Sequence, residues 1–276
     1  CAALPDTGYL QTAEIDVPFD IRTASERTLD CFLVLNEDIM HLKKGHIMAR
    51  EQFVLGRYSA PSVVSSGDKQ LKLSYSKSDK VYTVSGADFE LKFSSKSGEI
   101  YSYKRGGREY LASGIRPQFS RANIDNELLA QVPFEWVKTF LGLHAFDNAE
   151  KMMKAASVKA EEGNSYVRLS VTWRTKYLSG IRTDYKVTPD GRIAVSMECR
   201  NIVPVNLPRF GITFELAEGI DGIDYYGKGP HENYCDRKTG AYLGVYSFER
   251  SEDFIHDYLF PQENANRCDI RWMKVG

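Results

Sequence analysis

Short segments of this chain alternate strictly between apolar and polar residues, and Gly, Asp and Ser residues separate one segment from the next. In residues 12–21, for example, Ile15, Val17, Phe19 and Ile21 occupy every second position. Successive side chains of a strand point to opposite faces of a sheet, so this period is typical of strands with one buried face. The pattern argues against a helical bundle and predicts an all-β fold.

The alternation predicts strands along most of the chain, in two groups separated near residue 58. The first group is 12–21, where Pro18 indicates a sheet edge, 29–35 and 46–55. The second group is 71–75, 80–85, 89–94, 100–104, 108–111, 166–178, 182–187, 193–200 and 209–216. Residues 116–150 break the alternation, and within them 134–145 have the apolar spacing of a short helix.

Domain organisation follows from the number of strands. An antiparallel sandwich closes with about seven strands, so the three before residue 58 predict the end of a β-domain whose other strands lie elsewhere. Residues 59–70 are rich in Ser, Gly and Pro, which predicts a linker. Residues 71–276 contain enough strands for a large antiparallel β-sandwich of their own.

The strands predicted before residue 58 share an apolar face that lacks partner strands. Its members are Ile15, Val17, Leu33, Leu35 and Ile47. Exposed apolar patches of more than roughly a few hundred Å² promote association. We therefore expect dimerisation or aggregation unless residues 71–276 cover this face.

Charge and composition exclude several classes of partner. The 36 Lys and Arg residues balance 37 Asp and Glu residues, which leaves no chain-wide basic surface for nucleic acid. Apolar runs such as 32–35 are short, so no membrane contact is expected. The five cysteines form no group with zinc spacing, so no metal site is predicted in this chain.

Three dense polar segments interrupt the strand pattern and are the candidate functional regions. They are residues 117–127, 225–237 and 258–272. Each mixes carboxylates, Asn and Arg with aromatic residues, a combination that can bind sugar hydroxyls and pack against a sugar face. The same side chains can instead satisfy backbone groups of loops that have left a sheet. Both interpretations remain open for each residue.

Several blocks along the chain, in the same order, resemble the C-terminal part of family-2 glycoside hydrolases of the bacterial β-galactosidase type. They are 44–53, Phe119–Ala122 with Asp125 and Asn126, 207–211, 227–237, and 261–264 with Arg267 and Arg271. The block 227–237, Gly-Lys-Gly-Pro-His-Glu-Asn-Tyr-Cys-Asp-Arg, is the most specific. The sequence departs from the family at Asn123, where proline is common.

The resemblance implies a fold and a domain plan. Residues 1–58 would be the C-terminal part of an immunoglobulin-like β-sandwich domain, and 59–70 a linker. Residues 71–276 would be the last, small-chain domain, a galactose mutarotase-like supersandwich truncated at its C-terminus. The family's catalytic carboxylates lie in an upstream barrel, so the resemblance implies no catalytic residue here.

The resemblance also implies roles for particular residues. The expected substrate-binding residues are Arg121, Asn123, Asp125, Asn126, Glu127, His231, Glu232 and Asn233. The expected structural residues are Asp236, Arg237, Glu263, Asn264, Arg267 and Arg271. The implied partners are a β-galactoside, the catalytic barrel and further copies of the chain. The parent enzyme would use magnesium and sodium ions, in the cytoplasm or periplasm of a bacterium.

Two other functions fit the same polar segments. One is a non-catalytic carbohydrate-binding or assembly module of epimerase-like fold. The other is an active aldose 1-epimerase, with His231 and Glu232, or His256 and Glu263, as acid and base. We favour the β-galactosidase interpretation over these two, because the matching blocks are those of the hydrolases.

Overall fold

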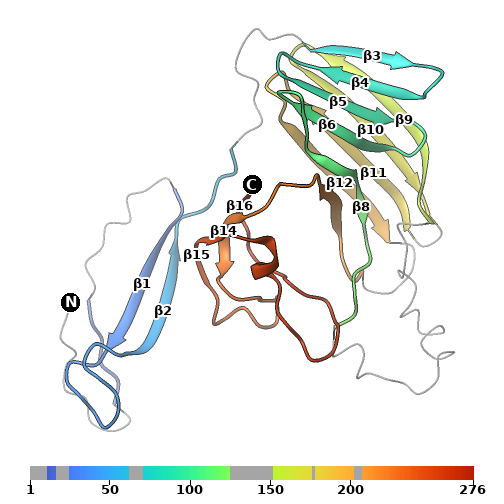
Figure 1. The fold of residues 1–276 in the computed structure, drawn as a ribbon. Helices are drawn as coiled ribbons and strands as arrows, with labels where there is room; N and C mark the ends of the chain where they lie inside the picture. The colour runs from blue at the N-terminus through green and yellow to red at the C-terminus, as the bar shows by residue number, and fades with distance from the viewer. Residues whose placement is uncertain (1–10, 17–24, 62–70, 125–151, 176–177, 202–206) are drawn as a thin grey trace, which may run out of the picture.

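The computed structural model describes residues 11–16, 25–61, 71–124, 152–175, 178–201 and 207–276 (Figure 1). The strands are β1 (Arg27–Val34), β2 (Ile47–Leu55), β3 (Lys72–Ser76), β4 (Val81–Ser85), β5 (Phe89–Ser94), β6 (Glu99–Arg105), β7 (Arg108–Glu109), β8 (Leu111–Gln118), β9 (Lys154–Gly163), β10 (Tyr166–Arg174), β11 (Leu178–Val187), β12 (Ile193–Asn201), β13 (Gly211–Leu216), β14 (Ile223–Gly229), β15 (Tyr242–Phe248) and β16 (Trp272–Val275). Among the described residues, no helix has the length and apolar character needed to cross a bilayer.

Two antiparallel sheets face each other and form a sandwich, drawn at the top of Figure 1. The larger has the order β13-β8-β6-β5-β4-β3, with β7 paired to β6. The smaller has the order β12-β11-β10-β9. The sequence prediction of an all-β fold with a large antiparallel β-sandwich is therefore confirmed.

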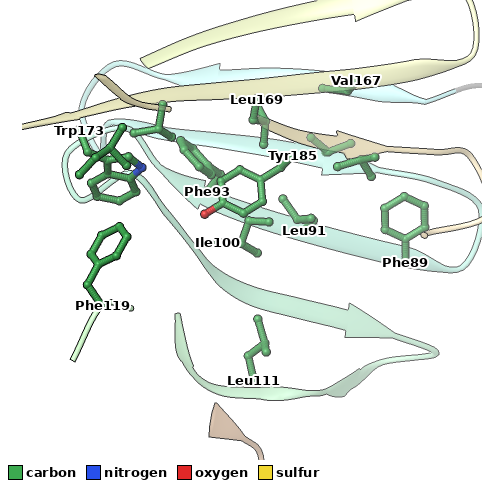
Figure 2. Close-up of a cluster of buried hydrophobic side chains, with 14 residues drawn as sticks. Phe89, Leu91, Phe93, Ile100, Leu111, Phe119, Val167, Leu169, Trp173 and Tyr185 are labelled. Carbon is green, nitrogen blue, oxygen red and sulfur yellow. The ribbon is translucent and has the colours of Figure 1, made fainter. Parts of the chain in front are cut away.

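The core of the sandwich lies between these sheets, and strand alternation supplies it. In β10 every second side chain from Val167 to Trp173 is buried. Figure 2 shows the rings of Phe93 and Tyr185 at its centre, with centroids 6.0 Å apart. The buried Tyr185 hydroxyl is satisfied, because it donates to the Ile115 carbonyl at 3.2 Å. Burial of apolar area thus holds the two sheets together.

Some strand predictions were wrong at their boundaries. The strand predicted at 166–178 ends at Arg174, and the one predicted at 108–111 divides at Tyr110 into β7 and β8. Residues 11–16 are not in a strand, and the rest of the 12–21 prediction falls largely outside the described residues. The predicted helix 134–145 also lies outside them. The proposed domain boundaries stay predictions.

Strands β9, β14, β15 and β16 were not predicted. The inward positions of β9 include Ala155 and Ala160, which give little apolar contrast. In β14, Gly227 and Gly229 look like turn residues but serve close packing. A Cβ on Gly227 would lie 2.9 Å from the Ile270 Cα, so glycine is needed there.

A separate sheet, β15-β14-β16, carries a small aromatic core. The Tyr225 ring is fully buried, with its centroid 5.7 Å from the Phe254 ring and 5.4 Å from the Tyr246 ring. Phe254 belongs to the short 3-10 helix Ser251–Phe254. This sheet carries two of the three polar segments at its edges.

The hairpin β1–β2 contacts this sheet through its polar face. The Gln52 amide donates to the Leu243 carbonyl at 2.9 Å and accepts from the Leu243 N–H at 2.6 Å. The Arg50 guanidinium lies 3.9 Å from the centroid of the Tyr242 ring. The apolar face is not covered: Leu33 is 44% and Ile47 is 53% exposed. The predicted association through that face stays a prediction.

A buried ion pair joins the start of the hairpin to the end of the chain. The Arg271 Nε and Nη2 donate to the Glu26 carboxylate at 3.0 and 2.7 Å. The Glu26 side chain is only 4% exposed. The hydrogen bond from Arg271 lowers the pKa of Glu26, and burial with the nearby carboxylate raises the pKa of Tyr226 to about 12.

We expect Phe93→Ala to lower the free energy of unfolding by about 3–5 kcal/mol, because it removes a fully buried ring. Urea denaturation followed by tryptophan fluorescence measures the loss. Tyr101→Ala is the control, since Tyr101 is 40% exposed on the neighbouring strand. An equal loss in both variants would contradict this account of the core.

Arg271→Ala should lower the free energy of unfolding by about 3–5 kcal/mol, because it leaves a buried carboxylate unpaired. The folded-state pKa of Glu26 lies below its unfolded value, so the pair adds stability above that value. This contribution disappears as pH falls through the lowered pKa. The stability difference between wild type and Glu26→Gln should therefore shrink between pH 6 and about pH 3. A difference independent of pH would argue against the ion pair.

Candidate functional site

The described parts of the three polar segments lie together. The Glu263 N–H donates to the Asn123 carbonyl at 3.0 Å, which joins the first segment to the third. The Asn233 N–H donates to the Asn266 carbonyl at 3.0 Å, which joins the second to the third. Residues far apart in the sequence therefore form one polar region beside the β15-β14-β16 sheet.

Asn233 holds the corner at which the second segment leaves its sheet. Strand β14 ends at Gly229, and Pro230 has no N–H with which to continue the ladder. The Asn233 amide donates to the carbonyls of Lys228 at 3.0 Å and His231 at 2.9 Å. Its oxygen accepts from the Cys268 N–H at 2.9 Å. With 1% exposure, this side chain replaces the lost sheet partners.

Glu232 is a buried carboxylate with charged and neutral donors around it. Its side chain is 4% exposed. One oxygen accepts from the Arg237 guanidinium and the Tyr258 hydroxyl. The other accepts from the Ala265 N–H at 2.7 Å. The carboxylate therefore clips the second and third segments together.

A second ion pair joins the third segment to the chain that leads into β13. Arg209 donates to the Glu263 carboxylate, whose side chain is 11% exposed. Beside it, Arg121 donates to the carbonyls of Pro208 at 3.3 Å and Ala122 at 2.9 Å. Two arginines from different parts of the chain are thus held side by side.

These segments enclose a cavity of about 740 Å³, which falls in the usual range for small-molecule sites. Its lining includes Arg121, Arg209, Tyr234, Arg237, Tyr258 and Gln262. The Tyr234 hydroxyl oxygen is buried and has no hydrogen-bond partner within the described part of the chain. Burial, followed by nearby acidic groups, raises the pKa of Tyr234 to about 12, so the hydroxyl keeps its proton at neutral pH.

A smaller pocket of about 360 Å³ lies on the other side of Arg237 and Tyr258, which line both spaces. His231, His256 and Arg267 also line it. Arg267 donates to the Pro230 carbonyl at 3.0 Å and lies 4.2 Å from the Phe254 ring centroid. The guanidinium therefore braces the pocket wall.

The structure distributes the predicted site residues among three positions. Arg121, Asp236 and Arg237 line the larger cavity, and His231, Glu232, Arg237 and Arg267 line the smaller pocket. Asn233, Glu263, Asn264 and Arg271 make internal contacts, with the Asn264 oxygen accepting from the His256 N–H at 2.8 Å. Asn123 is exposed and contributes its carbonyl. Asp125, Asn126 and Glu127 lie outside the described residues, and the substrate-binding role of the set stays a prediction.

Four residues that line the larger cavity were not singled out from the sequence. They are Arg209, Tyr234, Tyr258 and Gln262. All but Arg209 belong to the polar segments, so composition pointed to their region but not to their orientation. Arg209 was placed in a predicted strand and in the family-like block 207–211, without a site role.

The acid–base pairs required for an epimerase are not formed among the described residues. The Glu232 oxygens contact Arg237, Tyr258 and the Ala265 N–H, and Glu263 contacts Arg209. Neither carboxylate contacts His231 or His256 in these hydrogen bonds. Each is instead paired with a guanidinium, Glu232 with Arg237 and Glu263 with Arg209.

The described residues do not gather a ligand set for the ions implied by the resemblance. No group of three or more His, Cys, Asp or Glu side chains with metal-binding geometry occurs among them. The buried carboxylates Glu26, Glu232 and Glu263 are instead paired with arginines. The use of magnesium and sodium by the parent enzyme stays a prediction.

Comparison with known proteins points to one family. The sequence model described as "Beta galactosidase small chain" matches residues 85–276. The chain is 32% identical over 256 residues to a protein named beta-galactosidase from Priestia megaterium. It is 28% identical over 266 residues to one from Vibrio cholerae and 25% identical over 270 residues to one from Oenococcus oeni.

These alignments are unequal in their coverage. The alignments to the Priestia megaterium, Vibrio cholerae and Oenococcus oeni proteins include 91%, 91% and 92% of this chain. They include only 23%, 25% and 25% of those three proteins. The chain therefore spans about a quarter of the length of the curated relatives it matches.

We expect Asn233→Asp to lower the free energy of unfolding by about 3 kcal/mol or more at pH 7. The substitution places a carboxylate against two carbonyls in a buried corner. The loss should shrink at lower pH, because burial raises the pKa of the new carboxyl and its protonated form can donate one hydrogen bond. Urea titrations at pH 7 and pH 5 measure both effects.

The matched control is Asn123→Asp, the same change on an exposed side chain, for which we expect an effect within about 0.5 kcal/mol. Equal losses at the two positions would show that Asn233 is not the brace described above.

Proposed function

This chain belongs to the beta galactosidase small chain family, and from that premise we propose that it forms part of a β-galactosidase. The parent activity is hydrolysis of terminal β-D-galactosyl residues. Within that enzyme the chain shapes the sugar pocket and braces the assembly. The match of the family over residues 85–276 is the observation that carries the proposal.

The bond-breaking acids belong to another part of the enzyme. Glycoside hydrolysis uses two carboxyl groups that flank the scissile bond, one of them free to give a proton. Glu232 and Glu263 are each paired with an arginine. They are the most buried acidic residues in the described parts of the polar segments. We assign them to bracing and the chemistry to a barrel domain outside this chain.

The cavity of about 740 Å³ supports a role at the sugar pocket. Tyr234 and Tyr258 offer aromatic faces, and Arg121, Arg237 and Gln262 offer polar groups that can bind hydroxyls. These residues come from the three segments that resemble the hydrolases. Asp236 at the cavity edge adds an acceptor.

The partners that we propose are a β-galactoside, the catalytic barrel and a further copy of the chain. The relatives are about four times as long as this chain, which leaves room for the barrel. The uncovered apolar face of β1–β2, where Phe53 is 51% and Ile47 is 53% exposed, supports contact with another domain or subunit.

A non-catalytic carbohydrate-binding module is the second candidate. The same cavity favours it, because a monosaccharide can be bound there without any acid or base. A titration with galactose, followed by tyrosine and tryptophan fluorescence, distinguishes it: saturable binding by the chain alone is expected for a module.

The test of the first proposal combines this chain with the rest of a relative. We expect no hydrolysis of a chromogenic β-galactoside by the chain alone. Addition of the chain to the Priestia megaterium protein lacking its matching quarter should restore turnover. Asn233→Asp should fail to restore it, whereas Asn164→Asp, the same change in the exposed turn between β9 and β10, should succeed. Turnover by the chain alone at ordinary enzyme rates, or no restoration by the folded wild-type chain, would refute the proposal.

A further inference from the structure

The larger cavity presents more hydrogen-bond donors than acceptors. Arg209 and Arg237 line it, but the carboxylates that pair with them, Glu263 and Glu232, are not part of its lining. Both carboxylates are buried behind their arginines, with side-chain exposures of 11% and 4%. The Arg209 and Arg237 side chains are 34% and 51% exposed, and both line the cavity.

Each guanidinium has donors to spare. A guanidinium carries five N–H groups in a fixed planar fork. Within the described part of the chain, Arg209 and Arg237 each use only one nitrogen, Nη2, for their side-chain hydrogen bonds. The Nε and Nη1 groups of both are available to a ligand. Planar forks of this kind match the oxygens of carboxylate and phosphate groups.

Tyr234 adds a donor that the protein itself does not use. Its hydroxyl oxygen is buried and lacks a partner among the described residues, although the side chain lines the cavity. A buried hydroxyl without a partner is unfavourable, and such groups usually mark a missing ligand or water. Because the pKa of Tyr234 is raised to about 12, this hydroxyl donates at neutral pH.

Charged acceptors are scarce in the same lining, although the Gln262 and Asn266 amides carry neutral acceptor oxygens. Asp236 is the only carboxylate among the described lining residues, and its side chain is exposed at the rim. A neutral sugar hydroxyl needs an acceptor as well as donors, whereas a carboxylate or phosphate needs donors only. The balance favours a ligand that accepts hydrogen bonds and carries negative charge.

We propose that this cavity binds a small oxyanion, a carboxylate or phosphate group, through Arg209, Arg237 and the Tyr234 hydroxyl. Arg121 lies beside Arg209 and adds positive charge to the same wall. The ligand is either a sugar acid, whose ring packs on Tyr258, or free phosphate. This property goes beyond galactoside hydrolysis and does not depend on it.

Isothermal titration calorimetry on the full chain, at constant ionic strength, tests the proposal with three probes: galacturonate, inorganic phosphate and galactose. We expect at least one anion to bind at least about tenfold more tightly than galactose. Tighter binding of galacturonate identifies a sugar acid, and equal or tighter binding of phosphate identifies the free anion. No anion binding up to about 50 mM, or galactose binding as tightly as either anion, overturns the proposal.

Tyr234→Phe is the decisive variant, because it removes only the unpartnered hydroxyl. It should weaken anion binding by about tenfold and leave the urea midpoint unchanged or higher. Tyr101→Phe, an exposed position on the sandwich, is the matched control and should change neither value. Unchanged anion binding by Tyr234→Phe overturns the proposal.

Alkylation of Cys235 gives an independent measurement on the wild-type chain. Cys235 is exposed and lines the cavity, whereas Cys31 lies in β1, away from it. The anion should slow labelling of Cys235, measured by peptide mass spectrometry, and leave labelling of Cys31 unchanged. Equal rates for Cys235 with and without anion overturn the proposal. A galactosidase assay is not involved, so failure here leaves the proposed function standing.

Discussion

Backbone groups that leave a sheet must find new partners, and the polar region of this protein is organised around that requirement. At the end of β14 the ladder stops, and Asn233 supplies two donors and an acceptor in its place. Glu232 does the same for the Ala265 N–H of the third segment. Once these groups are fixed, the positions of Arg237 and Tyr258 follow, since both donate to the Glu232 carboxylate. The shape of the cavity therefore depends on buried polar side chains that do not line it.

The charged side chains are arranged in the same way, with buried groups supporting more exposed ones. Buried carboxylates lie behind Arg209, Arg237 and Arg271, and each guanidinium reaches outward from its partner. A pair of this kind is not itself a large source of stability, because burying both charges requires them to lose water. Its effect is to fix the direction of a side chain. The buried carboxylates thus hold Arg209 and Arg237 in place, and these arginine side chains stay partly exposed at the cavity.

The alternation of residues such as Val167, Leu169 and Val171 was enough to predict the sandwich and much of its core. It failed in β9, where Ala155 and Ala160 give little contrast, and in β14, where glycines permit close packing rather than a turn. Composition singled out the three polar segments, and the structure shows that their described parts contact one another. Which side chain braces and which lines a cavity could not be predicted, because Glu232 and Asp236 have similar chemistry and differ only in burial. The Glu26–Arg271 pair left no local pattern, since its members are 245 residues apart.

That long separation has a consequence for how the chain is made. During synthesis the hairpin β1–β2 leaves the ribosome before β15, β16 and Arg271, because more than 185 residues separate Leu55 from Tyr242. At about 5–20 residues per second, the hairpin waits on the order of ten seconds or more for its intramolecular partners. During this interval the face of the hairpin that carries Arg50 and Gln52 lacks its β15 partners and is open to chaperones or to neighbouring nascent chains. Docking of the hairpin is thereby one of the last events in the maturation of this part of the protein.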